Sequence, residues 1–371
     1  MVDRRTFLLT PAALLAAAAE RKPNVVLITA GGWRAQAVPW AQDAEIEPAN
    51  LSAFGRQSVT FSRAYSSYPR AIPARSALLK GRFPRSLPAG TASLGAVLKA
   101  AGYRVGTFGN RQAEDIVPFV HAPGDTPFYV EWIFESAGGL VERVSGARAR
   151  IRENVPEKMH GRVRTLLADF YSRCIARDRD IGLVLAALDR PGLLEDTLVI
   201  FTSDHGDQFG SQGIYGADAP FEESVRIPLA LRYPRALRQP GANTMLVSQI
   251  DILPTIATLC GAAVPKDVHG RDLASQLLDG SGERPDAVYA IGRASQQSEW
   301  RMLVHGYDKL VTGADGRMTH LFNLAEDPFE NTNLAEASSA QLKRDSLVAL
   351  QQAWTRKLGD RVEQGSGLRI R

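Results

Sequence analysis

One short segment of the chain has the composition of an anion-binding loop. Pro73 and Arg75 lie in the segment AYSSYPRAIPARSALLKGRFP (64–84), which predicts a loop and then a helix that begins near Arg75 or Ser76. Free backbone N–H groups at a helix start attract negative charge, and an arginine adds a two-pronged hydrogen-bond donor. The four residues from Ala71 to Ala74 offer no hydroxyl, thiol or carboxylate. The segment therefore has donors that can hold an anion, but no nucleophile that can attack it.

Polar residues also follow the predicted strands. Asp204 and His205 come directly after an apolar run at 197–202. In an open α/β sheet, ligands bind beyond the carboxyl ends of the strands. Three loops leave such ends, and together with the helix start near Arg75 they predict one pocket. These loops are 30–33, 109–112 and 203–206.

Each of these side chains also has an ordinary structural role as an alternative. Arg75 either anchors an anion or pairs with a nearby carboxylate. Asp204 either keeps a ligand role or caps a turn, and His205 is either a residual metal ligand or a loop residue. Ser66 and Ser67 lie just upstream of the loop, but the sequence shows no base beside them that would activate a hydroxyl.

The pattern of apolar residues predicts the elements that must position this pocket. The run at 24–30 is almost wholly apolar, as in a central strand covered on both faces. Between 161 and 188 apolar residues recur at gaps of three or four, which predicts a long amphipathic helix. Further strands are expected at 58–66, 104–110, 127–134, 197–202 and 227–234, and further helices at 91–103 and 248–262. This alternation predicts an α/β fold with a mostly parallel central sheet flanked by helices.

The pattern changes after about Gly280. Short strands joined by tight turns predict a small antiparallel sheet, and an amphipathic helix follows them. The strands are expected at 286–293, 299–306, 307–313 and 318–324, and the helix at 338–360. We therefore expect an α/β domain at 21–282 and a C-terminal α+β subdomain at 283–371.

The composition excludes several classes of protein. The chain has 371 residues, of which 44% are apolar and 23% charged, as in an ordinary globular protein rather than a disordered one. The net charge is only +4, and the basic run at 146–152 is more typical of a solvated helix face than of a nucleic-acid site. Cys174 and Cys260 are the two cysteines, and both lie in apolar helical patterns that predict buried free thiols.

The first residues, MVDRRTFLLTPAALLAAAAERKPN, match a bacterial export signal of the twin-arginine type. Arg4 and Arg5 precede a modest apolar stretch and small residues up to Ala19. The stretch is too short for a membrane span. We expect a signal peptide at 1–20 and a mature protein without a stable membrane span, in the periplasm or outside the cell. The alternative is that these residues form an N-terminal helix of the fold.

Five segments, in this order, resemble the sulfatase family of the alkaline-phosphatase-like superfamily. They are KPNVVLITAGGWRAQ (22–36), PANLSAFGRQSVTFSRAYSSYPRAIPARSALLKGRFP (48–84), DTLVIFTSDHGDQFGSQGIYGADAPFEESVRIPLALRYP (196–234), VSQIDILPTIATLCGAAVPKDVHGRDLASQLL (247–278) and HLFNLAEDPFENTNLA (320–335). Each segment alone is moderate evidence, and their order strengthens the resemblance. It implies an alkaline-phosphatase-like sandwich and a reaction centre at the predicted pocket.

The resemblance implies a metal site that this chain has largely lost. Members of the family hold calcium or magnesium with two adjacent aspartates after the first strand, where this chain has Gly31 and Gly32. Two further ligands of the family match Asp204 and His205. Calcium takes about six to eight oxygen ligands, which one aspartate and one imidazole cannot supply. We therefore expect no cofactor, and calcium or magnesium only if the site survives in altered form.

The resemblance also implies that the catalytic side chains are substituted. The family's nucleophile is a cysteine or serine converted to formylglycine, and Ala71 stands at that position. The lysine and histidine of a G-K-W-H segment are replaced by Asn110 and Gln112, and a second lysine by Ala217. Alanine cannot become an aldehyde, and without the cation and lysines little balances the charge of a sulfate ester.

Three functions remain open from the sequence. The first is an inactive or severely impaired sulfatase that binds an anionic ligand, such as a sulfated one, a carbohydrate-like ligand or a protein partner. The alternative is an active hydrolase of sulfate or phosphate esters with rearranged catalytic groups. The third is a purely structural or interaction protein. We do not expect a nucleic-acid partner.

Overall fold

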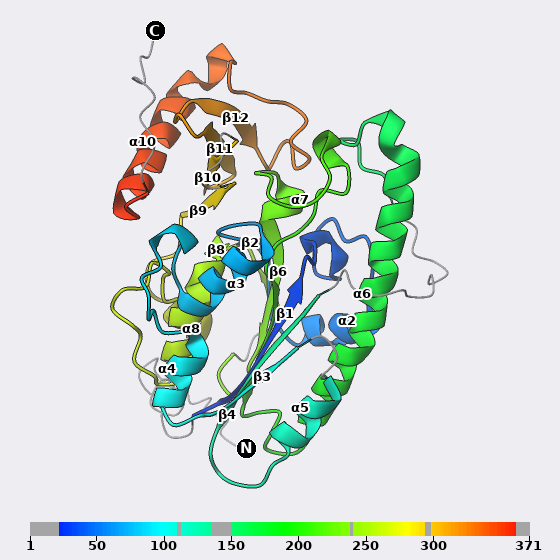
Figure 1. The fold of residues 1–371 in the computed structure, drawn as a ribbon, viewed down its shortest axis with the longest axis vertical. Coiled ribbons are helices and arrows are strands. Elements are labelled where there is room, and N and C mark those ends of the chain that lie inside the picture. The colour runs from blue at the N-terminus through cyan, green and yellow to red at the C-terminus, as the bar shows by residue number, and fades with distance from the viewer. Residues whose placement is uncertain (1–21, 110–112, 136–149, 238–239, 294–297, 361–371) are drawn as a thin grey trace, which may run out of the picture.

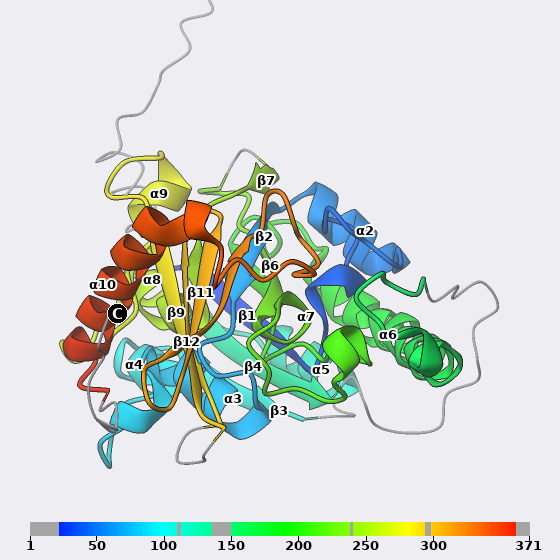
Figure 2. The same cartoon turned by 90° about the horizontal axis from the view of Figure 1, so that it is seen from above.

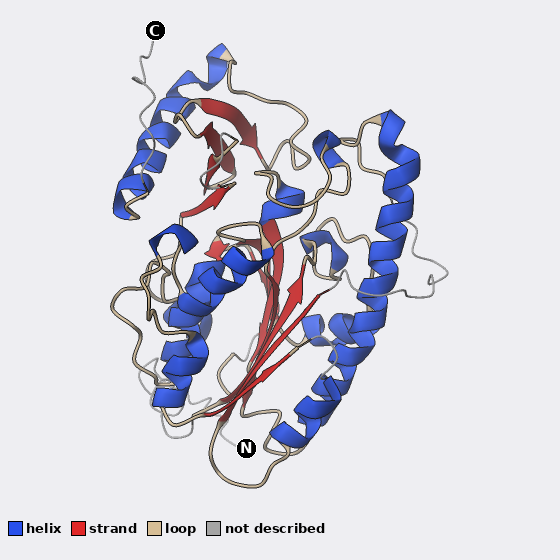
Figure 3. Ribbon diagram, viewed as in Figure 1, coloured by secondary structure: helices blue, strands red, loops and turns tan. Residues whose placement is uncertain are grey.

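The computed structural model describes residues 22–109, 113–135, 150–237, 240–293 and 298–360. It contains an eight-stranded central sheet with helices on both faces, and a smaller four-stranded antiparallel sheet that precedes the last helix (Figures 1 and 3). The strands are β1 Asn24–Gly31, β2 Val59–Tyr65, β3 Arg104–Phe108, β4 Phe128–Glu135, β5 Thr197–Ser203, β6 Arg226–Arg232, β7 Gly241–Asn243, β8 Val247–Ser248, β9 Ala287–Gly292, β10 Trp300–His305, β11 Asp308–Gly313 and β12 Met318–Asn323. The helices are α2 Ala49–Arg56, α3 Ala71–Lys80, α4 Leu94–Ala100, α5 Ala113–Val120, α6 His160–Leu188, α7 Glu222–Val225, α8 Ile252–Leu259, α9 Ala274–Leu278 and α10 Gln341–Lys357. The predicted α/β class is confirmed.

The central sheet is parallel in one half and mixed in the other. Its strand order is β3-β4-β1-β5-β6-β2-β7, with β8 also paired to β2. The first four strands of this order are parallel, whereas β6 runs antiparallel to both of its neighbours. In the parallel half, Ala30 of β1 pairs with Ser203 of β5. The carboxyl ends of β1 and β5 therefore meet, as a shared pocket requires.

Strand β1 is apolar throughout because both of its faces are buried. Its side chains alternate between two cores: Val25 and Leu27 pack with α4 and α8 on one face, and Val26 and Ile28 pack with α2, α5 and α6 on the other. Cys260 belongs to the first core and Cys174 to the second. Both are buried free thiols, as predicted.

The antiparallel sheet has the order β12-β11-β10-β9, and it packs against α10. Seen from above, α10 and this sheet lie on one side of the central sheet, and α6 lies on the other (Figure 2). Side chains of α3 and η2 (Pro84–Ser86) contact the antiparallel sheet, so both parts of the chain share a core. The subdomain boundary near residue 282 stays a prediction.

Helix α3 begins earlier than the sequence predicts. Its first residue is Ala71, after the extended Arg70, and not Arg75 or Ser76. Pro73 lies in the first turn, where a missing N–H leaves no helical hydrogen bond unmade. The predicted signal peptide, residues 1–20, lies outside the described residues. In the described ranges, no helix has the length and apolar character needed to cross a membrane.

Candidate functional site

The carboxyl ends of β1 and β5 meet around a single buried carboxylate. Asp204 follows β5 directly and has no exposed surface. Its Oδ1 accepts hydrogen bonds from the backbone N–H of Gly32, at 2.7 Å, and of His205, at 2.8 Å. The Ser203 hydroxyl accepts a further bond from the Trp33 N–H, at 3.0 Å. The loops at Gly31–Gly32 and at 203–206 are thus tied together, as their place in the sequence predicts.

Arg75 completes the surroundings of this carboxylate. Its Nε lies 2.9 Å from Oδ2 of Asp204, and its side chain is 22% exposed. Of the two roles that the sequence left open for Arg75, the structure places it in an ion pair with a carboxylate. Both oxygens of Asp204 therefore have donors inside the protein: one guanidinium and two backbone amides.

The start of α3 presents apolar side chains. Ala71 is the first residue of the helix, and Ile72 is 81% exposed. Arg70 precedes the helix in extended conformation, and no side chain caps the first turn. The free amides of this turn remain a place where an anion can bind, but the side chains of Ala71 and Ile72 carry no group that forms a covalent intermediate.

His205 is turned toward its own loop. Its Nδ1 lies 2.7 Å from the carbonyl oxygen of Gly206, and its Nε2 lies 3.8 Å from Oδ1 of Asp204. A ring nitrogen 2.7 Å from a carbonyl donates its proton to it, so Nδ1 is the protonated nitrogen. Gly206 itself is tightly enclosed, because a Cβ there would lie 2.0 Å from the carbonyl oxygen of Glu223. The loop after β5 is thus fixed in place.

The residues at this centre do not fit a divalent cation. A hard cation needs several oxygen ligands, but Gly31 and Gly32 bring no side chain, and Arg75 already pairs with Asp204. Throughout the described ranges, no three His, Cys, Asp or Glu residues come together in a way that could hold a metal ion.

Of the remaining predicted positions, those within the described ranges add no catalytic group. Ala217 is half-buried and precedes Asp218, whose carboxyl pKa is raised by burial. Asn110 and Gln112 lie outside the described residues. Ser66 is fully buried, and its hydroxyl donates to the Asp204 carbonyl, at 2.6 Å. It supports the loop after β5.

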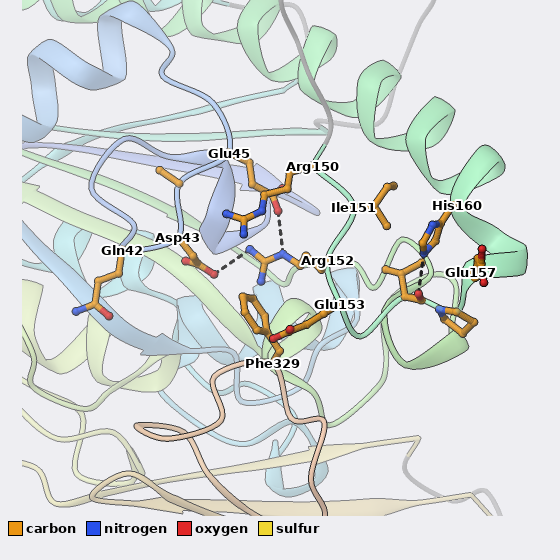
Figure 4. A pocket seen from close by; sticks show the side chains of 13 residues that line it. Gln42, Asp43, Glu45, Arg150, Ile151, Arg152, Glu153, Glu157, His160 and Phe329 are labelled. Carbon is orange, nitrogen blue, oxygen red and sulfur yellow. Dashed lines mark hydrogen bonds and ion pairs between the residues drawn. The ribbon is translucent and has the colours of Figure 1, made fainter.

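One large pocket has no counterpart in the sequence prediction. It has a volume of about 940 Å³ and lies between the loop before α2, the segment that leads into α6, and Phe329. Figure 4 shows Asp43, Glu45 and Arg152 gathered at one wall. Arg152 bonds Glu45 through Nε, at 2.8 Å, and Asp43 through Nη2, at 2.9 Å. Its guanidinium carbon lies 5.1 Å from the centre of the Phe329 ring.

A second pocket of about 250 Å³ adjoins the first, since Gln42, Asp43 and Phe329 line both. Arg226 lines the second pocket and donates to both oxygens of Asp43, at 2.8 Å. Burial alone would raise the pKa of Asp43, but Arg226 and Arg152 outweigh it and hold that pKa well below its usual range. Asp43 is therefore a charged bridge between two arginines, and it separates the two pockets.

Sequence reasoning missed these pockets for a physical reason. Their walls come from segments that lie more than seventy residues apart, near 42, 152, 226 and 329. No motif with short spacing joins them. A possible signal was the presence of acidic residues at 43 and 45 in a segment with few other charges, but nothing in the sequence indicates their partners.

Known families and proteins resemble the chain over most of its length. Residues 23–126 and 142–262 match the model of the family described as Sulfatase, and residues 210–354 match the one described as N-sulphoglucosamine sulphohydrolase, C-terminal. An ulvan-active sulfatase of Formosa agariphila is 24% identical over 91% of this chain and 82% of its own length. Arylsulfatase K of Xenopus laevis is 31% identical over 47% of this chain, and the match spans about a third (34%) of that protein.

Solved structures show the same fold. One of them, in complex with its substrate D-glucosamine-2-N,6-O-disulfate, has a TM-score of 0.83 and 14% sequence identity. The match covers 94% of this chain and 100% of that chain. At this identity, the likeness concerns the fold alone.

Proposed function

The chain belongs to the sulfatase family, and from this premise we propose that its reaction centre is inactive or severely impaired. The observation that carries the proposal is the pairing of Asp204 with Arg75, at 2.9 Å. The sequence resemblance, which supports it, implies that Gly31, Gly32 and Ala71 stand at the family's ligand and nucleophile positions. A centre of this kind has neither the cation nor the nucleophile that hydrolysis of a sulfate ester needs. The role that we propose for it is binding rather than turnover.

The ligand that suits such a centre is an anionic or carbohydrate-like molecule, or a protein partner. The uncapped first turn of α3 supports an anion, because its amides have no side-chain acceptor. The structure with bound D-glucosamine-2-N,6-O-disulfate is that of a fold relative with a sulfated sugar as substrate. We propose the same chemical class for this chain, with no resident metal.

A second candidate is an active hydrolase of sulfate or phosphate esters with rearranged groups. The family and the names of the relatives favour it, since both relatives above are named as sulfatases. The residues at the centre favour the first candidate. An active enzyme would need a nucleophile, which Ala71 cannot supply, or a metal site, and the described residues bring no three His, Cys, Asp or Glu together.

Turnover assays separate these two candidates. Purified protein is incubated with 4-nitrophenyl sulfate and 4-nitrophenyl phosphate, each with calcium, magnesium, manganese or zinc, beside an Asp204→Ala variant purified in the same way. We expect equal background rates for both proteins and no near-stoichiometric divalent metal by elemental analysis. Metal-dependent turnover that Asp204→Ala abolishes would establish the hydrolase instead.

Export is part of the proposal. The pattern at 1–20, with Arg4 and Arg5, supports a twin-arginine signal and a periplasmic or extracellular protein. Replacing both arginines by lysine in the full chain should retain the protein in the cytoplasm, as measured by cell fractionation.

A further inference from the structure

Two adjoining pockets form one groove where the loops of the central sheet meet the C-terminal part of the chain. We call it the seam groove and define it by the three residues common to both pockets, Gln42, Asp43 and Phe329. None of the positions at the Asp204 centre lines it. We propose that the seam groove binds an uncharged oligosaccharide, independently of whether the Asp204 centre hydrolyses esters.

The charges of the seam groove are arranged to neutralise one another. Asp43 bonds Arg152 and Arg226, and Arg152 also bonds Glu45. Its walls carry five carboxylates and four guanidinium groups in all, a net charge of about −1 with the single histidine neutral. Of the four guanidinium groups, those of Arg152 and Arg226 are held in ion pairs with carboxylates, while that of Arg63 donates to the Gly306 carbonyl and lies over the Tyr307 ring. Over the groove as a whole, a sulfated ligand would meet a slight excess of negative charge. The groove is therefore polar without favouring an anion.

Paired charges still offer hydrogen bonds. A carboxylate has about four acceptor positions and a guanidinium five donor hydrogens, so one or two ion-pair contacts leave others for hydroxyl groups. Gln42 is exposed and adds an amide. Water or sugar hydroxyls can satisfy such groups without a change in charge.

An aromatic ring supplies the apolar part of the site. Phe329 is half-buried and lines both pockets, and Figure 4 shows its ring beside the Arg152 guanidinium. Tyr307 lines the far pocket and is 48% exposed, with the Arg63 guanidinium 4.2 Å from its ring centre. The C–H faces of sugar rings pack on aromatic rings, while their hydroxyls point sideways into polar walls. Aromatic and paired charged groups together therefore suit a neutral sugar.

The size of the groove suits more than one sugar ring. The larger pocket has about 940 Å³ and the smaller about 250 Å³. Pockets for organic ligands span roughly 300–1,000 Å³ and commonly lie between structural units. The two volumes adjoin at Phe329, so a short chain can contact that ring and reach both sides of Asp43.

Titration with matched sugars tests the proposal. Isothermal titration calorimetry uses the full chain with N-acetylchitotriose, cellotriose and maltotriose, and with N-sulfated chitotriose as the charged match of the first. We expect at least one neutral trisaccharide to bind with a Kd of about 1 mM or below, and N-sulfated chitotriose to bind at least about tenfold more weakly than N-acetylchitotriose. The absence of binding by all three neutral sugars at 5 mM, or tighter binding of the sulfated one, would overturn the proposal.

Variants locate the binding site. Phe329→Ala and Gln42→Ala, the latter at an exposed position, should each raise the Kd of the neutral sugar that binds by about fivefold or more. Two control substitutions at exposed positions should leave this Kd unchanged: Glu326→Gln outside the groove, and Ile72→Ala at the Asp204 centre. If Ile72→Ala weakens binding while Gln42→Ala and Phe329→Ala do not, the sugar binds at the start of α3, and the proposal is wrong. The ester assays are a separate readout, so failure of one proposal does not imply failure of the other.

Discussion

At the scale of single residues, the buried Asp204 shows how this centre meets its electrostatic requirement. A carboxylate with no exposed surface must be neutralised or fully hydrogen-bonded, because burial removes its hydration. Arg75 and the amides of Gly32 and His205 fulfil this requirement from within the chain. These contacts tie the loops after β1 and β5 to the start of α3.

This arrangement makes Arg75 a structural residue, and a first prediction follows. Arg75→Ala should lower the free energy of unfolding by about 2–3 kcal/mol in urea titrations, because the buried Asp204 would lose the cation with which it pairs; the partial exposure of Arg75 reduces the loss from the value for a fully buried pair. In an Asp204→Asn background, the same change should cost much less. Arg317→Ala, in an exposed pair with Asp315, is the control and should cost under about 1 kcal/mol. Equal losses from Arg75→Ala in both backgrounds would contradict this account.

A second residue-scale prediction concerns the glycine beside His205. Gly206→Ala places a methyl group 2.0 Å from the Glu223 carbonyl oxygen, so backbone must move. We expect a loss of about 2 kcal/mol or more in the free energy of unfolding, measured by urea titration. Gly161→Ala is the matched control, since a Cβ there meets nothing within 4 Å, and it should change stability by under about 1 kcal/mol. If the Gly206→Ala protein were as stable as the Gly161→Ala protein, the loop backbone would move at little cost in free energy, and the prediction would be wrong.

At the scale of elements, most of the fold could be predicted from the sequence. Strand β1 lies at Asn24–Gly31 where the apolar run predicts it, and α6 spans His160–Leu188 where gaps of three and four recur. These patterns report burial on one or both faces, which the central sheet imposes. The start of α3 was predicted four or five residues too late, because Pro73 was taken as part of a loop. A proline in the first turn is compatible with a helix.

The candidate site was only partly predictable. Asp204, Gly32 and Arg75 could be brought together because a parallel sheet gathers the carboxyl ends of its strands. Which partner Arg75 takes could not be predicted, since it depends on side-chain directions across 129 residues of chain. The sequence did not predict the seam groove, because its walls come from both parts of the chain.

Strand β11 carries a buried lysine, and a pH-dependent prediction belongs to this element. Lys309 lies 3.0 Å from Glu222 and 2.6 Å from Glu330. Burial raises the pKa of Glu330 from 4.5 to about 8; Lys309 opposes this shift, and Glu222 and Glu223 add to it. Between pH 4.5 and about pH 8, Glu330 keeps its proton in the folded protein but loses it in the unfolded chain. The free energy of unfolding should therefore fall as the pH rises through this range.

Glu330→Gln tests this dependence, because glutamine does not titrate. In urea titrations from pH 5 to 8, the free energy of unfolding should depend less on pH for the variant than for the unmodified chain. Across this range, the difference in free energy of unfolding between the two proteins should change by on the order of 2 kcal/mol. Glu326→Gln, at an exposed position, is the control and should leave the curve unchanged. Parallel curves for Glu330→Gln and the unmodified chain would mean that Glu330 is ionised throughout this range in the folded state.

At the scale of the whole molecule, one arginine joins the two parts of the chain. Arg85 lies in η2 beside the central sheet and bonds Glu299 and Asp360, each at 2.8 Å, on the C-terminal side. Arg301 bonds the same Asp360, at 2.7 Å. The antiparallel sheet and the chain after α10 are thus fixed to the central sheet by a small ionic network as well as by apolar packing.

Removing Arg85 should loosen this joint more than it weakens either sheet. In hydrogen exchange of Arg85→Ala, we expect faster exchange in β9 to β12 and α10, and little change in β1 and β5, because the carboxylates of Glu299 and Asp360 would lose a shared cation. Arg56→Ala, at an exposed position in α2, is the control. Uniform acceleration across both sheets would instead show that the two parts open only together.

The two cysteines can report when each face of the central sheet becomes exposed to solvent. Cys174 and Cys260 lie on opposite faces of the central sheet, and burial raises the pKa of both thiols, that of Cys260 to about 12. Neither thiol reacts readily while the helices that cover it stay packed on the sheet. A thiol reagent followed by peptide mass spectrometry would therefore time the exposure of each face separately, in the unaltered protein and without an added label site.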